Sequence, residues 1–493
     1  MEPSLSDKSF SAFIWVLIDK LGGSTINFIL TIILARLLSP EDFGLVAMVM
    51  ILFDVSSVFI ESGFSSALIR EKTISEVDKS TVFIFNLTAS VLLFAILFVF
   101  APNIAVFFGN EQLVWIIRIM GFSLVISSFG IIQTTTLTQQ IDFETQTKIR
   151  FTSVIISGIC GVTLAFLGFG VWALVAKMVT MILASTLLLW VKNPWKPTGT
   201  FSIPSFKRLF GFSSKILVIA VIDKFYSNIY QLLIGKYFSV TTLGFYKQAD
   251  NFRSISTNTL LQTIQRVTYP VLAKLQHDRK KQKEGYRRIM KMSSFVMIPA
   301  MVLLAILAKP VILTLVGAKW EPAVIFLQLL CIAGITSHFN SLNYNMLMVL
   351  GRVDLSLRLE VINKVNITIA VIAGIQFGIM GLVVGHVIAS YFELFINSFY
   401  SRKLLGYPLL QQFKDNSSSL LFSLLTGLLI FGFKFFIPSP HILVMFVGLA
   451  FGGTFYCFLH FLARTEEMDI IRQTILPKVF SLVSSFSGRR QAA

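Results

Sequence analysis

Polar side chains follow one face of the segment 243–270 at intervals of three or four residues. They are Lys247, Asn251, Ser254, Asn258, Gln262 and Gln265, with Asp250 and Arg253 beside them. Residues three and four apart share one face of a helix. Because Lys and Arg form charge-assisted hydrogen bonds with phosphate oxygens, such a face can bind an anionic solute. The segment is therefore a candidate binding helix.

Further ionisable residues lie inside otherwise apolar stretches. The cations are Lys20, Arg118, Lys177, Lys215, Lys224, Arg253 and Arg266, and the acids are Asp54, Asp223, Asp250 and Glu393. An ionisable group in a membrane is costly unless it faces water or a partner, so these positions outline a cavity. Since the cations outnumber the acids, we predict a site for an anionic solute, with Arg253, Lys20, Lys215 and Lys224 as the best candidates for contacts with phosphate oxygens. Arg266 is equally well placed to reach lipid headgroups.

The four acids have two interpretations, and the sequence leaves both open. Asp54, Asp223, Asp250 and Glu393 can neutralise Lys or Arg on neighbouring helices. They can also couple transport to Na⁺ or H⁺.

The composition excludes an ordinary soluble protein. Of 493 residues, 55% are hydrophobic and only 14% are charged, whereas soluble domains carry about 25% charged residues. The mean hydropathy is +0.77. Cys160, Cys331 and Cys457 all lie inside apolar runs, so neither a disulfide framework nor a cysteine metal site is indicated. We expect no cofactor and no metal.

The apolar runs are long enough to cross a membrane as helices, which takes about 17 to 25 residues. We predict an all-α polytopic membrane protein with about 14 transmembrane helices. They lie at 13–34, 44–60, 81–100, 113–132, 151–168, 171–190, 209–234, 243–270, 292–316, 322–350, 361–377, 381–400, 417–437 and 441–462. The segment 243–270 is too polar for a plain hydropathy threshold.

The distribution of Lys and Arg predicts the orientation of the chain. These residues gather in the connections after even-numbered spans, as at 274–291, and short loops rich in them stay cytoplasmic. Both termini are therefore predicted to be cytoplasmic. The net charge of +17 largely reflects this bias. Membrane topology and the attraction of basic residues to anionic lipid headgroups explain it. It requires no nucleic acid partner. Apolar residues recur at helical spacing in the tail 466–493, which predicts an amphipathic helix on the inner membrane surface or on a partner.

Two pairs of motifs indicate an internal repeat. ILARLLSPEDFGL at 33–45 resembles LIGKYFSVTTLGF at 233–245, with a shift of 244 − 44 = 200. FGVWALV at 169–175 resembles FGIMGLV at 377–383, with a shift of 378 − 170 = 208. We predict an N-terminal lobe at 1–200 with helices one to six and a C-terminal lobe at 201–405 with helices seven to twelve. Helices thirteen and fourteen follow at 406–465. A parallel repeat of this kind is typical of transporters, although it could also form a rigid scaffold.

Motifs for catalysis or nucleotide hydrolysis are absent from the sequence. It contains no GxxxxGK[ST], no HExxH and no long extracytoplasmic loop that could house a transferase site. We therefore expect a transporter, not an enzyme, driven by a gradient, by its substrate or by a partner.

Residues 33–68, ILARLLSPEDFGLVAMVMILFDVSSVFIESGFSSAL, and 348–360, MVLGRVDLSLRLE, carry a family resemblance. The chain resembles the Wzx-type oligosaccharide flippases, including the colanic acid exporter-like branch of lipopolysaccharide biosynthesis, in the multidrug/oligosaccharidyl-lipid/polysaccharide (MOP) exporter superfamily. The resemblance implies two six-helix lobes in a V shape plus two extra C-terminal helices. It also implies cavity cations on helices one, two, seven and eight, where this chain offers Lys20, Lys215, Lys224 and Arg253. Helix two instead offers Asp54.

The function implied is translocation of an undecaprenyl-pyrophosphate-linked oligosaccharide repeat unit across the bacterial inner membrane by alternating access. Surface polysaccharide synthesis (O-antigen, capsule or exopolysaccharide) would use the product, with a polysaccharide polymerase and glycosyltransferases as possible partners. The alternative is a multidrug or small-molecule cation exporter of the same fold, coupled to an H⁺ or Na⁺ gradient. Such an exporter should have a net acidic or apolar cavity.

Overall fold

The computed structural model describes residues 5–61, 64–71, 74–275, 278–436 and 440–475. Within these ranges every regular element is a helix, as predicted. The elements are α1 (Leu5–Leu37), α2 (Pro40–Glu61), α3 (Phe64–Arg70), α4 (Glu76–Phe108), α5 (Leu113–Ser128), α6 (Ile131–Gln139), α7 (Phe143–Phe166), α8 (Val171–Lys192), α9 (Ile203–Ser227), α10 (Ile229–Tyr237), α11 (Val240–Lys274), α12 (Arg279–Ile306), α13 (Ala308–Leu315), α14 (Ala323–Gly334), α15 (Ser337–Val349), α16 (Val353–Ile375), α17 (Gly378–Leu405), α18 (Leu409–Asp415), α19 (Ser417–Phe436), α20 (His441–Leu462) and α21 (Glu466–Ile470). A short 3₁₀ turn, Ala318–Trp320, and a π-helical turn, Ile471–Ile475, complete the set.

The protein is a multi-pass membrane protein. Among the described residues, 10 helices are long and apolar enough to span a membrane, or 12 if two bent pairs are each one span. The pairs are α5 with α6, bent by 43°, and α9 with α10, bent by 47°. Two further predicted spans coincide with α11 and α16, which lie outside this set. The total of 14 therefore stays a prediction.

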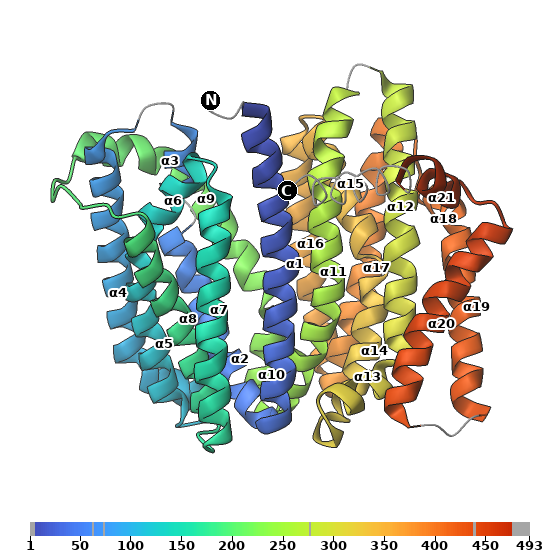
Figure 1. Ribbon diagram of the computed structural model, residues 1–493, viewed down its shortest axis with the longest axis horizontal. Helices are drawn as coiled ribbons and strands as arrows, with labels where there is room; N and C mark the ends of the chain where they lie inside the picture. Colours follow the sequence, from blue (N-terminus) through green and yellow to red (C-terminus); the bar gives the residue numbers. More distant parts are fainter. Residues whose placement is uncertain (1–4, 62–63, 72–73, 276–277, 437–439, 476–493) are drawn as a thin grey trace, which may run out of the picture. The chain divides into compact units, whose positions relative to one another are not determined.

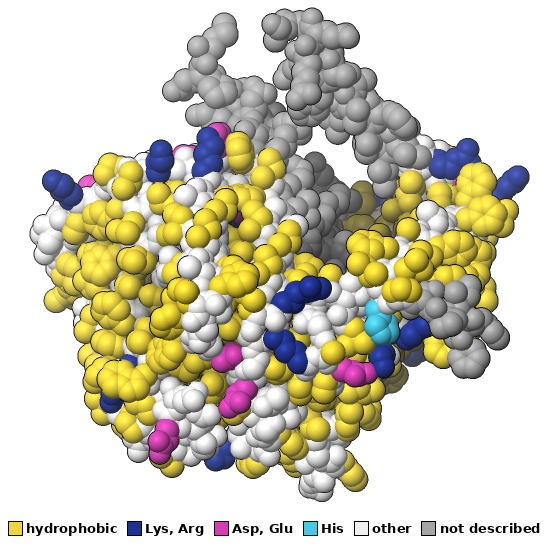
Figure 2. Space-filling view, turned by 60° about the horizontal axis from the view of Figure 1, so that its bottom comes forward, with side chains coloured by type: hydrophobic (Ala, Val, Ile, Leu, Met, Phe, Trp, Pro, Cys, Tyr) yellow, Lys and Arg dark blue, Asp and Glu magenta, His cyan; other side chains and the backbone are white. Residues whose placement is uncertain are grey.

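Large apolar side chains cover much of the protein surface. Figure 2 shows hydrophobic side chains, in yellow, over most of the visible face, with few Lys or Arg side chains among them. Val106 is 81% exposed, Phe166 72% and Phe377 78%. In water such a surface would aggregate, whereas in a membrane it contacts lipid chains.

The chain forms two compact units, Met1–Gln248 and Ala249–Ala493. The first contains α1 to α10 and the first turns of α11, and long helices run beside one another within it (Figure 1). The second contains the rest of α11 and the helices that follow. The division of the chain into an N-terminal lobe at 1–200 and a C-terminal lobe at 201–405 stays a prediction. The boundaries of the two extra helices and of the tail also stay predictions. Of that tail, residues 466–475 are helical and 476–493 lie outside the described residues.

The first pair of repeated motifs has the same local structure. Ser39 caps α2 by accepting a hydrogen bond from Asp42 N at 3.2 Å, and Ser239 caps α11 by accepting one from Thr242 N at 3.1 Å. Both caps satisfy a backbone amide that the first turn of a helix leaves free.

The starts of α2 and α11 also contact each other inside the first unit. A Cβ placed on Gly44 would overlap the carbonyl oxygen of Val240, and one placed on Gly244 would overlap that of Pro40. Since 240 is 40 + 200 and 244 is 44 + 200, each repeat makes the same contact with the other, as in a two-fold interface. We name Gly44, Gly244, Pro40 and Val240 the glycine clasp.

The second pair of motifs agrees as well. Gly170 precedes α8 with φ of 55°, and Gly378 begins α17 with φ of 73°. A positive φ is accessible to glycine at little cost. The connections α7–α8 and α16–α17 therefore share a glycine with positive φ at the equivalent position, 170 + 208 = 378.

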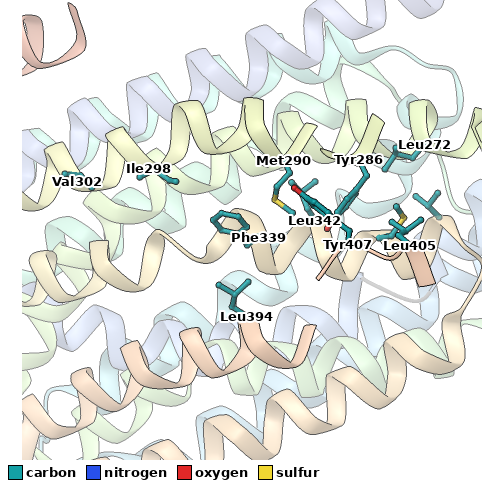
Figure 3. Packing of buried hydrophobic residues seen from close by; sticks show 12 residues of the cluster. Leu272, Tyr286, Met290, Ile298, Val302, Phe339, Leu342, Leu394, Leu405 and Tyr407 are labelled. Atoms are coloured by element: carbon teal, nitrogen blue, oxygen red, sulfur yellow. The ribbon is translucent and has the colours of Figure 1, made fainter. Parts of the chain in front are cut away.

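A polar hub joins four helices in the core of the second unit. Asn343 Oδ1 on α15 accepts hydrogen bonds from Tyr286 Oη of α12 at 2.9 Å, Ser401 Oγ of α17 at 2.6 Å and Gln412 Nε2 of α18 at 3.2 Å. Figure 3 shows Tyr286 and Tyr407 packed together among the aliphatic side chains of this core. The hub positions α15, which supplies five of the lining residues of the site described next.

Candidate functional site

A polar pocket with a volume of about 440 Å³ lies within the second unit. Thirteen of its lining residues are polar or small and one is leucine: Arg253, Leu261, Ala333, Thr336, Ser337, Asn340, Ser341, Tyr344, Asn345, Glu360, Asn363, His386, Ser390 and Glu393. We call this the polar pocket. Ligand sites in proteins commonly enclose about 300–1,000 Å³, so its size is that of a small-molecule site.

The local sequence explains why α15 lines this pocket. Thr336, Ser337, Asn340, Ser341 and Tyr344 recur at intervals of three or four residues, and Asn345 follows at once. This spacing places them on one face of the helix. The helix is interrupted between α14 and α15. There, Thr336 Oγ1 donates a hydrogen bond to the Ala333 carbonyl oxygen at 2.9 Å. Such side-chain bonds allow a broken helix at membrane depth.

Arg253 reaches the polar pocket from α11 and is held by an acid on its own helix. Its Nη2 lies 2.7 Å and its Nε 3.1 Å from Asp250 Oδ1. The side chain of Arg253 is 22% exposed and that of Asp250 is 17% exposed. A half-buried guanidinium with one carboxylate can still donate hydrogen bonds to an anion. The structure thus brings together three predicted site residues, Arg253, Asp250 and Glu393, around one pocket.

Glu393 lies on α17 and interacts with an amide of the same helix. Asn397 Nδ2 donates a hydrogen bond to Glu393 Oε1 at 3.4 Å. Across the pocket, Glu360 of α16 pairs with Lys364 at 2.8 Å. The polar pocket therefore contains two carboxylates and one guanidinium.

A second pair of predicted residues meets in the first unit. Lys224 Nζ of α9 lies 3.6 Å from Asp54 Oδ2 of α2, and Asn228 Nδ2 lies 3.4 Å from the same oxygen. The side chains of Lys224 and Asp54 are 44% and 28% exposed. Asp223, beside Lys224, is exposed.

We expect the Asp54–Lys224 pair to contribute little to folding. Its partners are partly exposed and 3.6 Å apart, and such pairs contribute about 0–1 kcal/mol. Asp54→Asn should therefore lower the free energy of unfolding in detergent by less than about 1 kcal/mol, as measured by thermal unfolding. Asp19→Asn, which breaks the 3.0 Å pair with Arg150, is the matched control. A loss of several kcal/mol for Asp54→Asn alone would contradict this expectation.

In the described part of the chain, the remaining predicted cations do not line the polar pocket. The Arg118 guanidinium lies over the Phe98 ring, 4.3 Å from its centroid, and 5.1 Å from that of Trp115. The stem of Lys177 crosses α7 at Gly161, where a Cβ would lie 2.7 Å from Lys177 Cβ. Lys20 is half-buried on α1. The side chains of Lys215 and Arg266 lie outside the described residues.

The sequence analysis missed most of the polar pocket. Asn340, Tyr344, Asn345, Glu360 and Asn363 all line it, and none was a predicted site residue. The polar stripe on 336–345 was readable as a helical face of the same kind as that of 243–270. His386 of α17 lines the pocket as well.

Comparison with known proteins identifies the family. The family model described as "Polysaccharide biosynthesis protein" matches residues 33–325, more than half of the chain. The teichuronic acid biosynthesis protein TuaB of Bacillus subtilis is 26% identical over 72% of this chain and 74% of its own length. The succinoglycan biosynthesis transport protein ExoT of Rhizobium meliloti is 26% identical over 68% of each chain.

The fold has a relative among solved structures. The lipid II flippase MurJ in its inward closed conformation superposes with a TM-score of 0.74 at 18% identity, over 92% of this chain and 99% of its own. At this identity the likeness concerns the fold alone. These comparisons confirm the predicted resemblance and the expectation that the chain is a transport protein, not an enzyme. The chain belongs to the polysaccharide biosynthesis protein family.

Proposed function

We propose that this protein translocates an undecaprenyl-pyrophosphate-linked oligosaccharide repeat unit from the cytoplasmic to the periplasmic leaflet of the bacterial inner membrane. The product serves the synthesis of a surface polysaccharide, and both termini lie in the cytoplasm. A polymerase and glycosyltransferases of the same pathway are the proposed partners. The observation that carries the proposal is a charged polar pocket within a membrane-spanning unit of a chain from this family.

The physical need for such a protein is clear from the substrate. Sugars and a diphosphate cannot cross hydrocarbon without a polar path, whereas a polyprenyl chain can stay in lipid throughout. We propose that Arg253, with Lys224, Lys20 and Lys215, captures the pyrophosphate from the cytoplasmic side. The two lobes then close that side and open to the periplasm.

A cation exporter of the same fold is the second candidate. Glu360 and Glu393 in the polar pocket favour it, because carboxylates can hold an organic cation or take part in coupling to H⁺ or Na⁺. Arg253 in the same pocket disfavours it, since a fixed positive charge repels a cationic drug.

Deleting the gene tests the proposal. We expect the deletion strain to lose its surface polysaccharide and to accumulate the lipid-linked repeat unit, since assembly of that unit continues on the cytoplasmic leaflet. Mass spectrometry of extracted lipids and blotting for the polysaccharide measure both effects. Unchanged polysaccharide together with increased sensitivity to cationic drugs would favour the exporter instead. A copy of the gene on a plasmid is the control and should restore the polysaccharide.

A further inference from the structure

The polar pocket contains more kinds of hydrogen-bonding group than a pyrophosphate needs. Besides Arg253 it presents two carboxylates, three amides and the hydroxyl of Tyr344. Carboxylates accept hydrogen bonds but repel phosphate oxygens, while amides and hydroxyls both donate and accept. Sugar hydroxyls likewise donate and accept. We propose that the polar pocket is a subsite for an uncharged sugar ring of the transported molecule, an inference that rests on the proposed function.

The size of the pocket favours a sugar over a bound ion. A volume of about 440 Å³ far exceeds the roughly 30 Å³ that one water molecule occupies in the liquid. Among the described residues, no group of three His, Cys, Asp or Glu side chains is placed to hold a metal ion. The occupant is therefore a polar molecule of many atoms.

Several polar groups around the pocket are fixed before any ligand arrives. Asn340 Nδ2 donates to the Ser390 carbonyl oxygen at 3.2 Å, and Asn363 Nδ2 donates to Asn397 Oδ1 at 3.2 Å. The nitrogen of the same Asn397 side chain, Nδ2, donates to Glu393 Oε1, as described above. These bonds join α15, α16 and α17 and hold the lining residues in place. Held side chains lose little entropy on binding, which is what a selective site requires.

The internal repeat shows that the fold does not require a carboxylate in this place. The first unit has a pocket of about 480 Å³ at the break between α5 and α6. Among the side chains that the structure describes, its polar lining consists of Ser and Thr hydroxyls, with no charged residue. Ser185 lines that pocket where Glu393 lines the polar pocket, because 185 + 208 = 393. Asp19 and Arg150, in a neighbouring pocket that shares Ser185, pair with each other at 3.0 Å.

Glu393 therefore has a role that packing does not explain. A membrane helix with serine at the equivalent position folds in the other unit of the same chain. Retaining an acid at this depth costs several kcal/mol unless it meets water or a partner. Within the protein, Asn397 Nδ2 meets one oxygen of Glu393 at 3.4 Å. A carboxylate accepts several hydrogen bonds, and the hydroxyls of a sugar supply further donors.

The test compares two lipids with purified protein in lipid nanodiscs. One is undecaprenyl pyrophosphate carrying the repeat unit extracted from the host cells, and the other is undecaprenyl pyrophosphate without sugar. Glu393→Leu and Tyr344→Phe should each weaken binding of the first lipid by about tenfold, the effect of one lost hydrogen bond to a buried polar group. Binding of the second lipid should change by less than about twofold, which also shows that the variants fold.

Glu393→Gln separates a sugar from a cation in this pocket. The amide keeps the shape and can still hydrogen-bond a hydroxyl, so affinity for the sugar-bearing lipid should fall by no more than about threefold. Equal losses for Glu393→Gln and Glu393→Leu would mean that the charge itself is needed, and would overturn the sugar subsite. If Glu393→Leu does not fold, Tyr344→Phe decides, and unchanged affinity overturns the proposal.

The chain offers a matched control three residues from Asn363. Asn366 bonds α17 in the same way, from Nδ2 to the Ala389 carbonyl oxygen at 2.9 Å, but it lines an apolar groove between α16 and α17. Asn366→Leu should leave the affinities for both lipids unchanged. A wild-type protein that binds both lipids equally would overturn only the sugar subsite, whereas one that binds neither would contradict the proposed function itself.

Discussion

Replacing Arg253 by alanine is expected to reduce translocation of the lipid-linked repeat unit to below about one hundredth of the wild-type rate. Arg253 is the cation that lines the polar pocket, and its partner Asp250 is 17% exposed. Without the guanidinium the pocket keeps the carboxylates of Glu360 and Glu393, which repel a pyrophosphate. Lys364 already pairs with Glu360 at 2.8 Å and so does not replace the lost cation. Flipping of a fluorescent lipid-linked oligosaccharide in proteoliposomes measures the rate.

Two further variants distinguish binding from charge pairing. If Arg253 only neutralises Asp250, then Asp250→Asn together with Arg253→Gln should restore transport, because neither charge remains unpaired. We expect this double variant to stay as inactive as Arg253→Ala. Arg352→Ala is the matched control, since Arg352 pairs with Asp354 at 2.8 Å on an exposed loop, and it should transport normally. Recovery in the double variant would show that Arg253 has no contact with the substrate.

The sequence predicted where the helices lie because apolar length is a local property. Each predicted span coincides with a helix or with two consecutive helices. The breaks within spans were not predicted, as at Phe129 and Gly130 between α5 and α6 or at Ile335 and Thr336 between α14 and α15. Both breaks lie in apolar sequence without proline. The local hydropathy therefore stays high across each break and does not reveal it. The side chains that satisfy the broken turns, such as Thr336, are also common in unbroken helices.

Site residues were predicted from the sequence only where they are conspicuous within a single segment. Arg253 and Asp250 stand out because α11 is polar over its whole length. Glu393 stands out as an acid in an apolar run. Asn340, Asn363 and Tyr344 come from three different turns of two helices, and only packing brings them to one pocket. A sequence pattern can place a residue on a face, but it does not tell which helix that face meets.

The structure gives a physical reason for the glycines that the two repeated motifs share. Weak likeness between 33–45 and 233–245 rests on common residues such as Gly44 and Gly244. The structure gives those glycines a shared reason, because each lies against the backbone of the other repeat in the glycine clasp. Close backbone contact is a usual reason for small residues between membrane helices.

Adding one methyl group to the glycine clasp is therefore expected to destabilise the protein strongly. Gly44→Ala and Gly244→Ala would each place a Cβ against a backbone carbonyl, with Val240 C or Pro40 C 2.8 Å away. Since a backbone cannot swing aside as a side chain does, α2 and α11 must separate, at a cost of about 3 kcal/mol or more. Thermal unfolding of the purified protein in detergent measures the loss.

Gly211→Ala provides the control on α9 of the same unit. No described atom lies within 4 Å of the Cβ that this substitution adds, so it should be neutral or stabilise the helix by up to about 1 kcal/mol. The two clasp variants should lose similar amounts, because each repeat presents the same atoms to the other. The double variant Gly44→Ala with Gly244→Ala should lose less than the sum, since helices separated by the first methyl group already have room for the second. A clasp variant as stable as Gly211→Ala would show that the starts of α2 and α11 are not in backbone contact in the membrane protein.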